Sequence, residues 1–180
     1  MPRLFIAIEI PPATRRQLHS VAPVAGVRRT REEQLHLTLH FLDDVDEQQL
    51  QPLMAAVAAV RVEPFSLTIA GVGRFPPRGR GSVLWAGLKA SAPLLALHNK
   101  VGQALTGVGF PLERRAYSPH VTLARLGPRT SRQVVETFLC EHASLALDTF
   151  EVDGFTLFES RLAPNGSTHI PLLRVPQAKS

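Results

Sequence analysis

The sequence contains one short motif twice, as Leu35-His36-Leu37-Thr38-Leu39 and as Pro119-His120-Val121-Thr122-Leu123. Apolar and polar residues alternate in both copies, which is typical of a β-strand with one face in the core. In each copy the histidine and the threonine then project together from the polar face of the strand. Since the chain has only seven histidines among 180 residues, two matching copies by chance are improbable. The repeat predicts a duplicated fold with one copy in each half.

The paired histidine and threonine suit acid–base chemistry at a phosphodiester. In-line attack needs one group that takes a proton from the nucleophile and another that protonates the leaving oxygen. Histidine, whose unperturbed pKa is near 6.5, can do either at neutral pH. The hydroxyl two residues later can donate to a phosphate oxygen. Two such pairs predict a site that needs no metal, although the repeat leaves open which histidine is the acid. The alternative is two polar strand residues without chemistry.

Around the two copies, predicted strands and helices are mixed. Strands are expected at 3–10, 35–41, 65–70, 82–88 and 119–126 and in the tail from 145, and helices at 13–21, 44–60, 91–105 and 131–142. Loops are expected at 26–33 and 71–81, with a turn at 164–166. No low-complexity linker divides the chain, and the order is not that of a doubly wound parallel sheet. We therefore predict an α+β fold, with residues 1–180 as a single two-lobed domain.

The charge balance gives a first indication of a partner. Twenty basic residues against fifteen acidic ones give a net charge of +5, and all but three of the basic residues are arginines. Guanidinium groups match phosphate oxygens, so this surface favours polyanions such as RNA, although codon usage can produce the same composition. The arginines expected to line the site are Arg28, Arg29, Arg31, Arg74, Arg78 and Arg80, with solvated loops as the alternative.

The composition also excludes several classes of protein. No apolar run approaches the roughly 18 residues that a membrane-spanning helix needs, so no membrane contact is expected. The single cysteine, Cys140, excludes a disulfide framework and a cysteine-based metal cluster.

His40 lies four residues after His36 on the same predicted strand face, about 13 Å away along the backbone, which is too far for a shared zinc ion. A cytoplasmic protein without a metal is expected.

In these motifs the sequence resembles the two-histidine (2H) phosphoesterases. Within that family it is most similar to the RNA 2′,3′-cyclic phosphodiesterase (2′–5′ RNA ligase-like) branch. The matching blocks are 4–8, 35–42, 75–77, 83–87, 119–125 and 157–160, followed by Pro164 and Gly166. The resemblance implies a bilobal, pseudo-symmetric duplicated fold, with two antiparallel sheets facing across a central cleft and helices outside. The chain differs from the family pattern at Asp43, where glycine is common, and at His169, where tyrosine is common.

The resemblance also implies an activity, the hydrolysis of RNA 2′,3′-cyclic phosphate ends to 2′-phosphate ends without a cofactor. His36 would be the proton donor and His120 the proton acceptor. Phe41 and Arg125 each come five positions after their histidine, so a bend in each strand is needed to bring them to the same face. The implied substrate contacts are Thr38, Thr122 and Arg125 at the phosphate and Phe41 at a base.

The expected partner is RNA with a 2′,3′-cyclic phosphate end, such as a tRNA fragment, bound by a monomer. One alternative is the reverse chemistry, an ATP-independent 2′–5′ ligation, which the same two histidines could carry out. Another is a non-catalytic RNA- or nucleotide-binding module, and a third is a small cyclic nucleotide as substrate. Trp85 and Tyr117 are further candidates for base stacking, with core packing as the alternative for Trp85.

Overall fold

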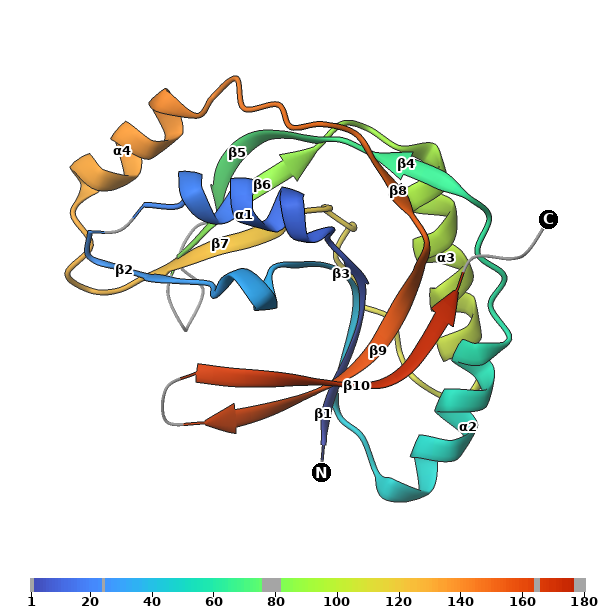
Figure 1. Ribbon diagram of the computed structural model, residues 1–180. Coiled ribbons are helices and arrows are strands. Elements are labelled where there is room, and N and C mark those ends of the chain that lie inside the picture. The colour runs from blue at the N-terminus through green and yellow to red at the C-terminus, as the bar shows by residue number, and fades with distance from the viewer. Residues whose placement is uncertain (1, 24, 76–81, 164–165, 177–180) are drawn as a thin grey trace.

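The computed structural model describes residues 2–23, 25–75, 82–163 and 166–176 (Figure 1). Its helices are α1 (Pro12–Val21), α2 (Glu47–Ala58), α3 (Ala92–Gly107) and α4 (Arg132–Glu141), with a 3₁₀ turn η1 (Glu32–Gln34). Its strands are β1 (Arg3–Glu9), β2 (Val27–Arg29), β3 (His36–Asp44), β4 (Phe65–Leu67), β5 (Ile69–Phe75), β6 (Val83–Leu88), β7 (Val121–Leu126), β8 (Phe150–Val152), β9 (Gly154–Ala163) and β10 (Gly166–Pro176). The mixture of helices and antiparallel strands confirms the α+β prediction.

Eight of the described strands form one antiparallel sheet in the order β10-β9-β1-β3-β7-β6-β5, with β2 also paired to β7. Within this sheet β3 and β7 meet at one register pair, Leu37 with Val121. This joint divides the sheet into a first half-sheet (β10, β9, β1 and β3) and a second half-sheet (β7, β6, β5 and β2). Each half-sheet carries one copy of the repeated motif at the joint. Strands β4 and β8 form a separate pair.

Helices lie beside both half-sheets (Figure 1). Helices α2 and α3 contact each other, and they also contact β10 and β3 respectively. Helices α1 and α4 lie together on the side of β2 and β7. The hydroxyls of Ser91 and Ser131 accept hydrogen bonds from the backbone N–H groups of Leu94 and Val134, which caps α3 and α4 at the residues where the sequence predicts these helices to begin. None of the helices in the described ranges is long and apolar enough to cross a membrane.

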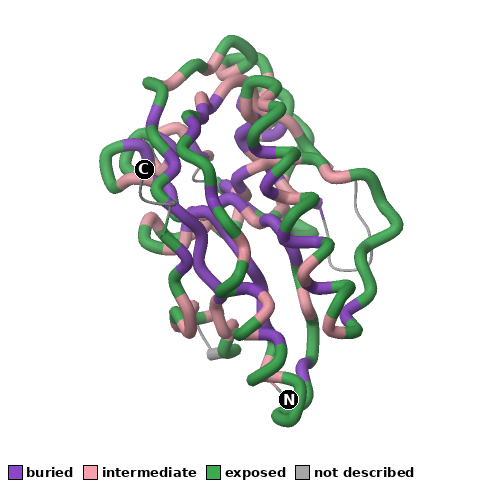
Figure 2. Tube along the Cα trace, turned by 90° about the vertical axis from the view of Figure 1, so that its right-hand side faces the viewer, coloured by how far each residue is buried: buried purple, intermediate pink, exposed green. Residues whose placement is uncertain are grey.

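Burial of the leucine side of the motif fixes the direction of the histidines. Leu37 and Val121 have no exposed surface, and they belong to a core that runs through both half-sheets. Figure 2 shows the buried residues concentrated along the central strands, with exposed residues on helices and loops. A slip of one residue in either strand would expose these side chains, each of which contributes roughly 1.5–3 kcal/mol by burial. The polar residues of the motif therefore share the opposite face of the sheet.

Two segments differ from the sequence prediction. Residues 71–75, expected to belong to a loop, are part of β5 because they pair with β6. Gly73 makes this pairing possible, since the Trp85 ring lies over it and a Cβ at that position would overlap the ring. Residues 26–33, also expected to be a loop, contain β2, which pairs with the distant strand β7, and the start of η1. The rest of the 71–81 loop, and residues 164–165 of the predicted turn, lie outside the described residues.

Candidate active site

The two copies of the motif lie side by side at the joint between the half-sheets. The register pair at the joint is antiparallel, so residues before it on one strand face residues after it on the other. His36 therefore lies beside Thr122, and Thr38 lies beside His120. All four side chains are half-buried. The charge of His120 also reaches His36, where it lowers the pKa.

The backbone holds both histidines in the same way. Nδ1 of His36 donates to the carbonyl oxygen of Gln34 at 2.6 Å, and Nδ1 of His120 donates to that of Ser118 at 2.7 Å. A carbonyl oxygen can only accept, so the hydrogen of each neutral ring lies on Nδ1. Nε2 is left to accept a proton when the ring is neutral and to donate one when it is charged. The two rings are equivalent in this respect, and only their surroundings can distinguish them.

A β-bulge lies at the last residue of the motif in each strand. The register of β3 against β1 skips Leu39, and the register of β7 against β6 skips Leu123. As a result two successive residues turn to the core side, Leu39 with His40 in β3 and Leu123 with Ala124 in β7, and all four are buried. The alternation resumes one position later. The fifth residue after each histidine therefore faces the same side as that histidine.

These bulges supply the bend that Phe41 and Arg125 require. Both residues are exposed on the histidine face, Phe41 with 57% of its surface accessible. The ring of Phe5 confirms the placement of Phe41, because it lies 4.9 Å from the His36 ring and 6.3 Å from the Phe41 ring. Since β3 and β7 are antiparallel, Phe41 and Arg125 lie toward opposite ends of the site.

The prediction that His40 shares a face with His36 is wrong, because the bulge shifts the alternation at this residue. His40 is buried against α3, where its Nε2 donates to the carbonyl oxygen of His98 at 2.9 Å and its ring stacks on the His98 ring at 4.2 Å. Within the described ranges, no three His, Cys, Asp or Glu side chains are placed to hold a metal ion.

Aromatic rings of the first half-sheet surround His36. The His169 ring, on β10, meets the His36 ring edge-on at 5.1 Å. Phe5 contacts both of these histidines and stacks on Phe158 at 5.2 Å. His36 therefore sits against a wall of rings that leaves little water around it.

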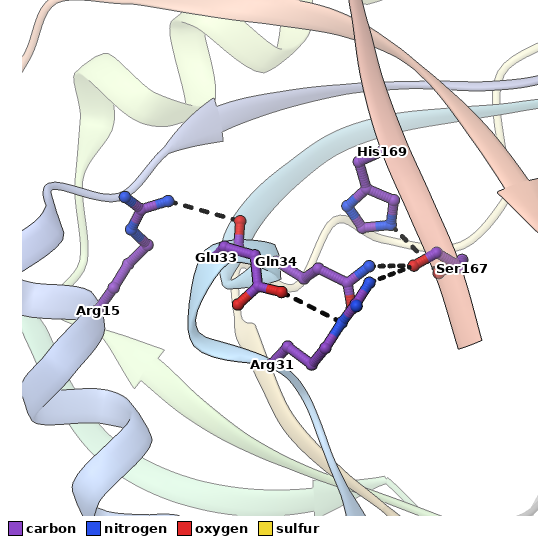
Figure 3. A network of polar contacts seen from close by, with 6 residues as sticks. All are labelled: Arg15, Arg31, Glu33, Gln34, Ser167 and His169. Atoms are coloured by element: carbon purple, nitrogen blue, oxygen red, sulfur yellow. Dashed lines mark hydrogen bonds and ion pairs between the residues drawn. The ribbon is translucent and has the colours of Figure 1, made fainter. Parts of the chain in front are cut away.

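A network of polar contacts ties β10 to the segment that precedes β3 (Figure 3). The side chains of Arg31 and Gln34 both donate to the carbonyl oxygen of Ser167, and the Ser167 hydroxyl lies 3.4 Å from Nε2 of His169. The carbonyl oxygen of Gln34 is also the acceptor for Nδ1 of His36. Gln34 thus connects the orientation of His36 to the position of the strand that carries His169.

The surroundings of His36 keep it uncharged. Burial lowers the pKa of His36 to about 4, and the nearby His169 and His120 lower it as well, against the hydrogen bond to Gln34, which raises it. Burial also lowers the pKa of His169, with the positive charge of Arg31 acting in the same direction. Both rings are therefore neutral at pH 7 in the free protein. A bound anion would raise the pKa of both.

His120 lies in a more cationic environment on the second half-sheet. The ring of Phe75 meets it edge-on at 4.7 Å, and the ring of Trp85 lies 6.4 Å away. The Arg115 guanidinium lies over the Phe75 ring, 5.2 Å from its centroid. Burial lowers the pKa of His120, the hydrogen bond to Ser118 opposes this, and the charge of Arg115 lowers it further.

The structure separates the arginines that the sequence grouped together. Arg29 is half-buried and donates to the carbonyl oxygen of His19, and Arg31 is bound to Ser167. Arg74 pairs with the buried Leu84 across β5 and β6, so it lies on the face opposite the histidines. Arg28 pairs with Arg125 across β2 and β7 and shares its face. Arg78 and Arg80 lie outside the described residues.

Sequence reasoning missed four residues around the histidines: Phe5, Phe75 and His169, whose rings contact them, and Arg115, whose charge acts on His120. Phe5 carries a usable signal, because it alternates with the buried Leu4 and Ile6 and so faces away from that side of the core. Arg115 comes from the segment between α3 and β7 and His169 from the far end of the chain, so no local pattern places them. Of the two stacking candidates, Trp85 lies near His120.

The other stacking candidate, Tyr117, is part of the joint instead. Its hydroxyl donates to the carbonyl oxygen of Thr38 at 2.9 Å, and its ring stacks on the His98 ring at 3.9 Å. Burial raises the pKa of the Tyr117 hydroxyl, which keeps it protonated as a donor. Tyr117 therefore connects the segment before β7 to β3.

Two imidazoles with available Nε2 atoms, two hydroxyls and a nearby arginine can exchange protons with an anionic phosphate ester and hold it. Together with the fold, this arrangement suits a phosphoesterase. The chain belongs to the 2′-5′ RNA ligase superfamily, whose family model matches residues 10–163. It is therefore an enzyme of the phosphoesterase class.

Individual relatives agree with this assignment. The RNA 2′,3′-cyclic phosphodiesterase of Archaeoglobus fulgidus is 31% identical, with 91% of this chain and 94% of the relative covered. The RNA 2′,3′-cyclic phosphodiesterase of Thermus thermophilus is 33% identical, with coverages of 94% and 87%. The crystal structure of E. coli LigT complexed with 3′-AMP matches with a TM-score of 0.78 and 26% identity, covering 99% of this chain and 100% of that one.

Proposed function

We propose that this protein hydrolyses RNA 2′,3′-cyclic phosphate ends to 2′-phosphate ends. The observation that carries the proposal is the joint itself, where two His-Thr pairs lie crosswise and each histidine has its Nδ1 tied to a backbone carbonyl. The names of the relatives support the substrate, since they are RNA 2′,3′-cyclic phosphodiesterases. Both pairs come from one chain, so a monomer, as one domain over residues 1–180, suffices for the reaction.

In the proposed reaction, water attacks the phosphorus from the side of His120. Nε2 of His120 accepts the proton of the water as the new P–O bond forms. The bond from phosphorus to the 3′ oxygen breaks, and Nε2 of His36 donates a proton to that oxygen. The product is a 2′-phosphate with a free 3′-hydroxyl, and proton exchange with solvent restores both rings. Thr38, Thr122 and Arg125 hold the phosphate oxygens, as the resemblance implies.

The negative charge of the bound substrate favours the protonated form of His36, which is the form that can donate a proton. His36 is neutral in the free protein at pH 7 because its pKa is about 4. A phosphate bound between the two motifs places a negative charge next to it, and this charge favours the protonated ring. His36 then becomes a donor only when substrate is present. His120 has the neutral form that a base requires.

Phe41 gives the site a place for the terminal base. Its ring is exposed on the histidine face and is supported from behind by Phe5. An exposed aromatic ring can stack on any base, which suits an enzyme that recognises an RNA end.

The test is hydrolysis of an RNA oligomer ending in a 2′,3′-cyclic phosphate, in EDTA, with the position of the product phosphate mapped. We expect a 2′-phosphate, and a loss of at least about a hundredfold in both His36→Ala and His120→Ala, the size of an acid–base contribution. Unchanged turnover in either variant would contradict the mechanism. RNA binding without turnover in the wild type would identify a binding module instead.

One observation also favours a second activity, ligation of the cyclic phosphate to a 5′-hydroxyl RNA end. The nucleophile lies beside His120, and there Phe75 and Trp85 offer rings on which the base of an acceptor nucleoside could stack. The 5′ oxygen would replace water, its proton would pass to His120, and the 3′ oxygen would leave as in hydrolysis. Adding a 5′-hydroxyl oligomer and looking for a longer product with a 2′–5′ linkage tests this activity.

A further inference from the structure

Arg28 and Arg125 form a pair of like charges on the histidine face. They are direct register partners across β2 and β7, and both are exposed. Like charges directly opposite each other in a sheet destabilise it. Neither guanidinium has a carboxylate within ion-pair distance among the residues that the structure describes, where the ion pairs involve other arginines. Within the described part of the chain, the fold thus keeps two adjacent positive charges without a carboxylate counterion.

The two side chains cover different parts of the surface. Arg125 follows Thr122 by three strand positions, roughly 10 Å at about 3.3 Å per residue, and it lies on the same face. The Arg28 guanidinium extends to the start of β10. Its Nη2 lies so close to Gly166 that a Cβ at position 166 would be 3.1 Å away from it. Arg31, from the same segment, also reaches β10 at Ser167. Arg28 therefore extends the cationic surface away from β7 and toward the first half-sheet.

A single cyclic phosphate does not match this charge. A cyclic phosphodiester carries one negative charge, which Arg125 alone can balance. Arg28 then remains without a counterion, unless the substrate brings a second phosphate. A mononucleotide has none, whereas in an RNA chain each further nucleotide adds one phosphodiester.

We propose that Arg28, opposite Arg125, binds the phosphodiester that precedes the terminal nucleotide, so that the preferred substrate is an oligonucleotide. The inference rests on the proposed function and names its substrate class. The terminal base lies toward Phe41 at one end of the site, the cyclic phosphate lies between the two motifs, and the RNA chain continues over the two arginines at the other end. An RNA backbone contact of this kind is sensitive to salt.

The test compares adenosine 2′,3′-cyclic phosphate with a triadenylate that ends in the same group. We expect the wild type to show a kcat/KM at least tenfold higher for the triadenylate. Arg28→Gln should remove most of this advantage and should lower the slope of log kcat/KM against log salt by about one, since one phosphate contact is lost. Arg74→Gln is the matched control, because Arg74 is exposed on the same half-sheet but on the opposite face. It should keep the full preference for the triadenylate.

Equal kcat/KM values for the two substrates in the wild type would overturn the proposal. So would an equal loss on both substrates in Arg28→Gln, because Arg28 would then contact the terminal phosphate. If neither substrate is hydrolysed, the proposed function fails, and binding decides the inference. In that case the wild type must bind the triadenylate more tightly than the mononucleotide, and Arg28→Gln must lose this difference.

The stability of the free protein gives an independent check. Removing one of two like charges relieves their repulsion, so Arg28→Gln should unfold at the same temperature as the wild type or at a higher one. A lower unfolding temperature would show that Arg28 stabilises the fold, and it would overturn the reading of the pair as an anion site.

Discussion

The two strands that carry the repeated motif are alike in backbone and different in one decisive side chain. Residues 36–41 and 120–125 have the same order of burial, alternating up to a bulge that places two successive residues in the core. Each histidine makes the same hydrogen bond through Nδ1. The position after the bulge is Phe41 in β3 and Arg125 in β7. The shared backbone presents two equivalent imidazole rings, whereas this one difference gives the site an aromatic end and a cationic end.

The surroundings of the two histidines also differ, with rings around His36 and an arginine near His120. His36 is enclosed by Phe5 and a third histidine, His169, which keep it neutral. His120 has Phe75 as its neighbour, with Arg115 over that ring. The comparison teaches that duplication can supply two histidines with the same backbone hydrogen bond, while the residues around each copy give the two rings different surroundings.

The largest expected effect concerns stability in acid, and it tests whether His36 is the more deeply buried of the two. The pKa of His36 is about 4 in the folded protein and near 6.5 when unfolded, so the unfolded chain binds more protons between these values. The stabilisation is complete above pH 6.5 and is lost as the pH falls toward 4, by on the order of 3 kcal/mol. Urea unfolding between pH 7 and pH 4 measures this loss. His36→Gln should remove more of the pH dependence than His120→Gln, and equal dependence in both variants would contradict the difference in burial.

The second prediction separates the two ends of the site. Phe41→Ala and Arg125→Gln should each weaken binding of a 2′-phosphate RNA oligomer by roughly tenfold, since stacking on one base is worth about 1–3 kcal/mol and a phosphate contact a similar amount. Only Arg125→Gln should lower the slope of log Kd against log salt, because only it removes a charge. Titrations at several salt concentrations measure both quantities. The same salt slope in both variants would show that the two ends do not differ in this way.

A smaller effect is expected at the joint. Tyr117→Phe removes the hydrogen bond to the Thr38 carbonyl and keeps the ring that stacks on His98. The free energy of unfolding should fall by about 1 kcal/mol, the usual net value of one hydrogen bond. Urea unfolding at pH 7 gives this value, and wild-type stability in the variant would mean that this bond does not hold the two half-sheets together.

The smallest effect concerns the third histidine. The charge of His169 lowers the pKa of His36, so His169→Gln should raise that pKa while keeping a polar side chain beside Ser167. A titration of the His36 ring by NMR measures the shift, and the acid limb of kcat/KM should move in the same direction. His142→Gln is a suitable control, because His142 lies at the end of α4, next to the groove between α1 and α4. An unshifted titration in His169→Gln would show that His169 only packs against the ring.

The sequence by itself determined which residue types the candidate site contains. The alternation in both copies of the motif placed each histidine and threonine on one strand face, because burying the leucines leaves them no other direction. The arginine content pointed to an anionic partner, and the paired motifs identified the family. All of these are local or compositional properties, which a single chain displays without its fold.

Only the tertiary structure decided how the strands pair and which side chains share a face. The bulges that turn Phe41 and Arg125 to the histidine face, and His40 away from it, exist only in the register of β3 against β1 and of β7 against β6. The register of β2 against β7 likewise sets Arg28 opposite Arg125. Register depends on contacts between segments that are far apart in the chain, and one skipped residue reverses every side chain beyond it. No local pattern carries that information, so it becomes readable only when the strands are paired.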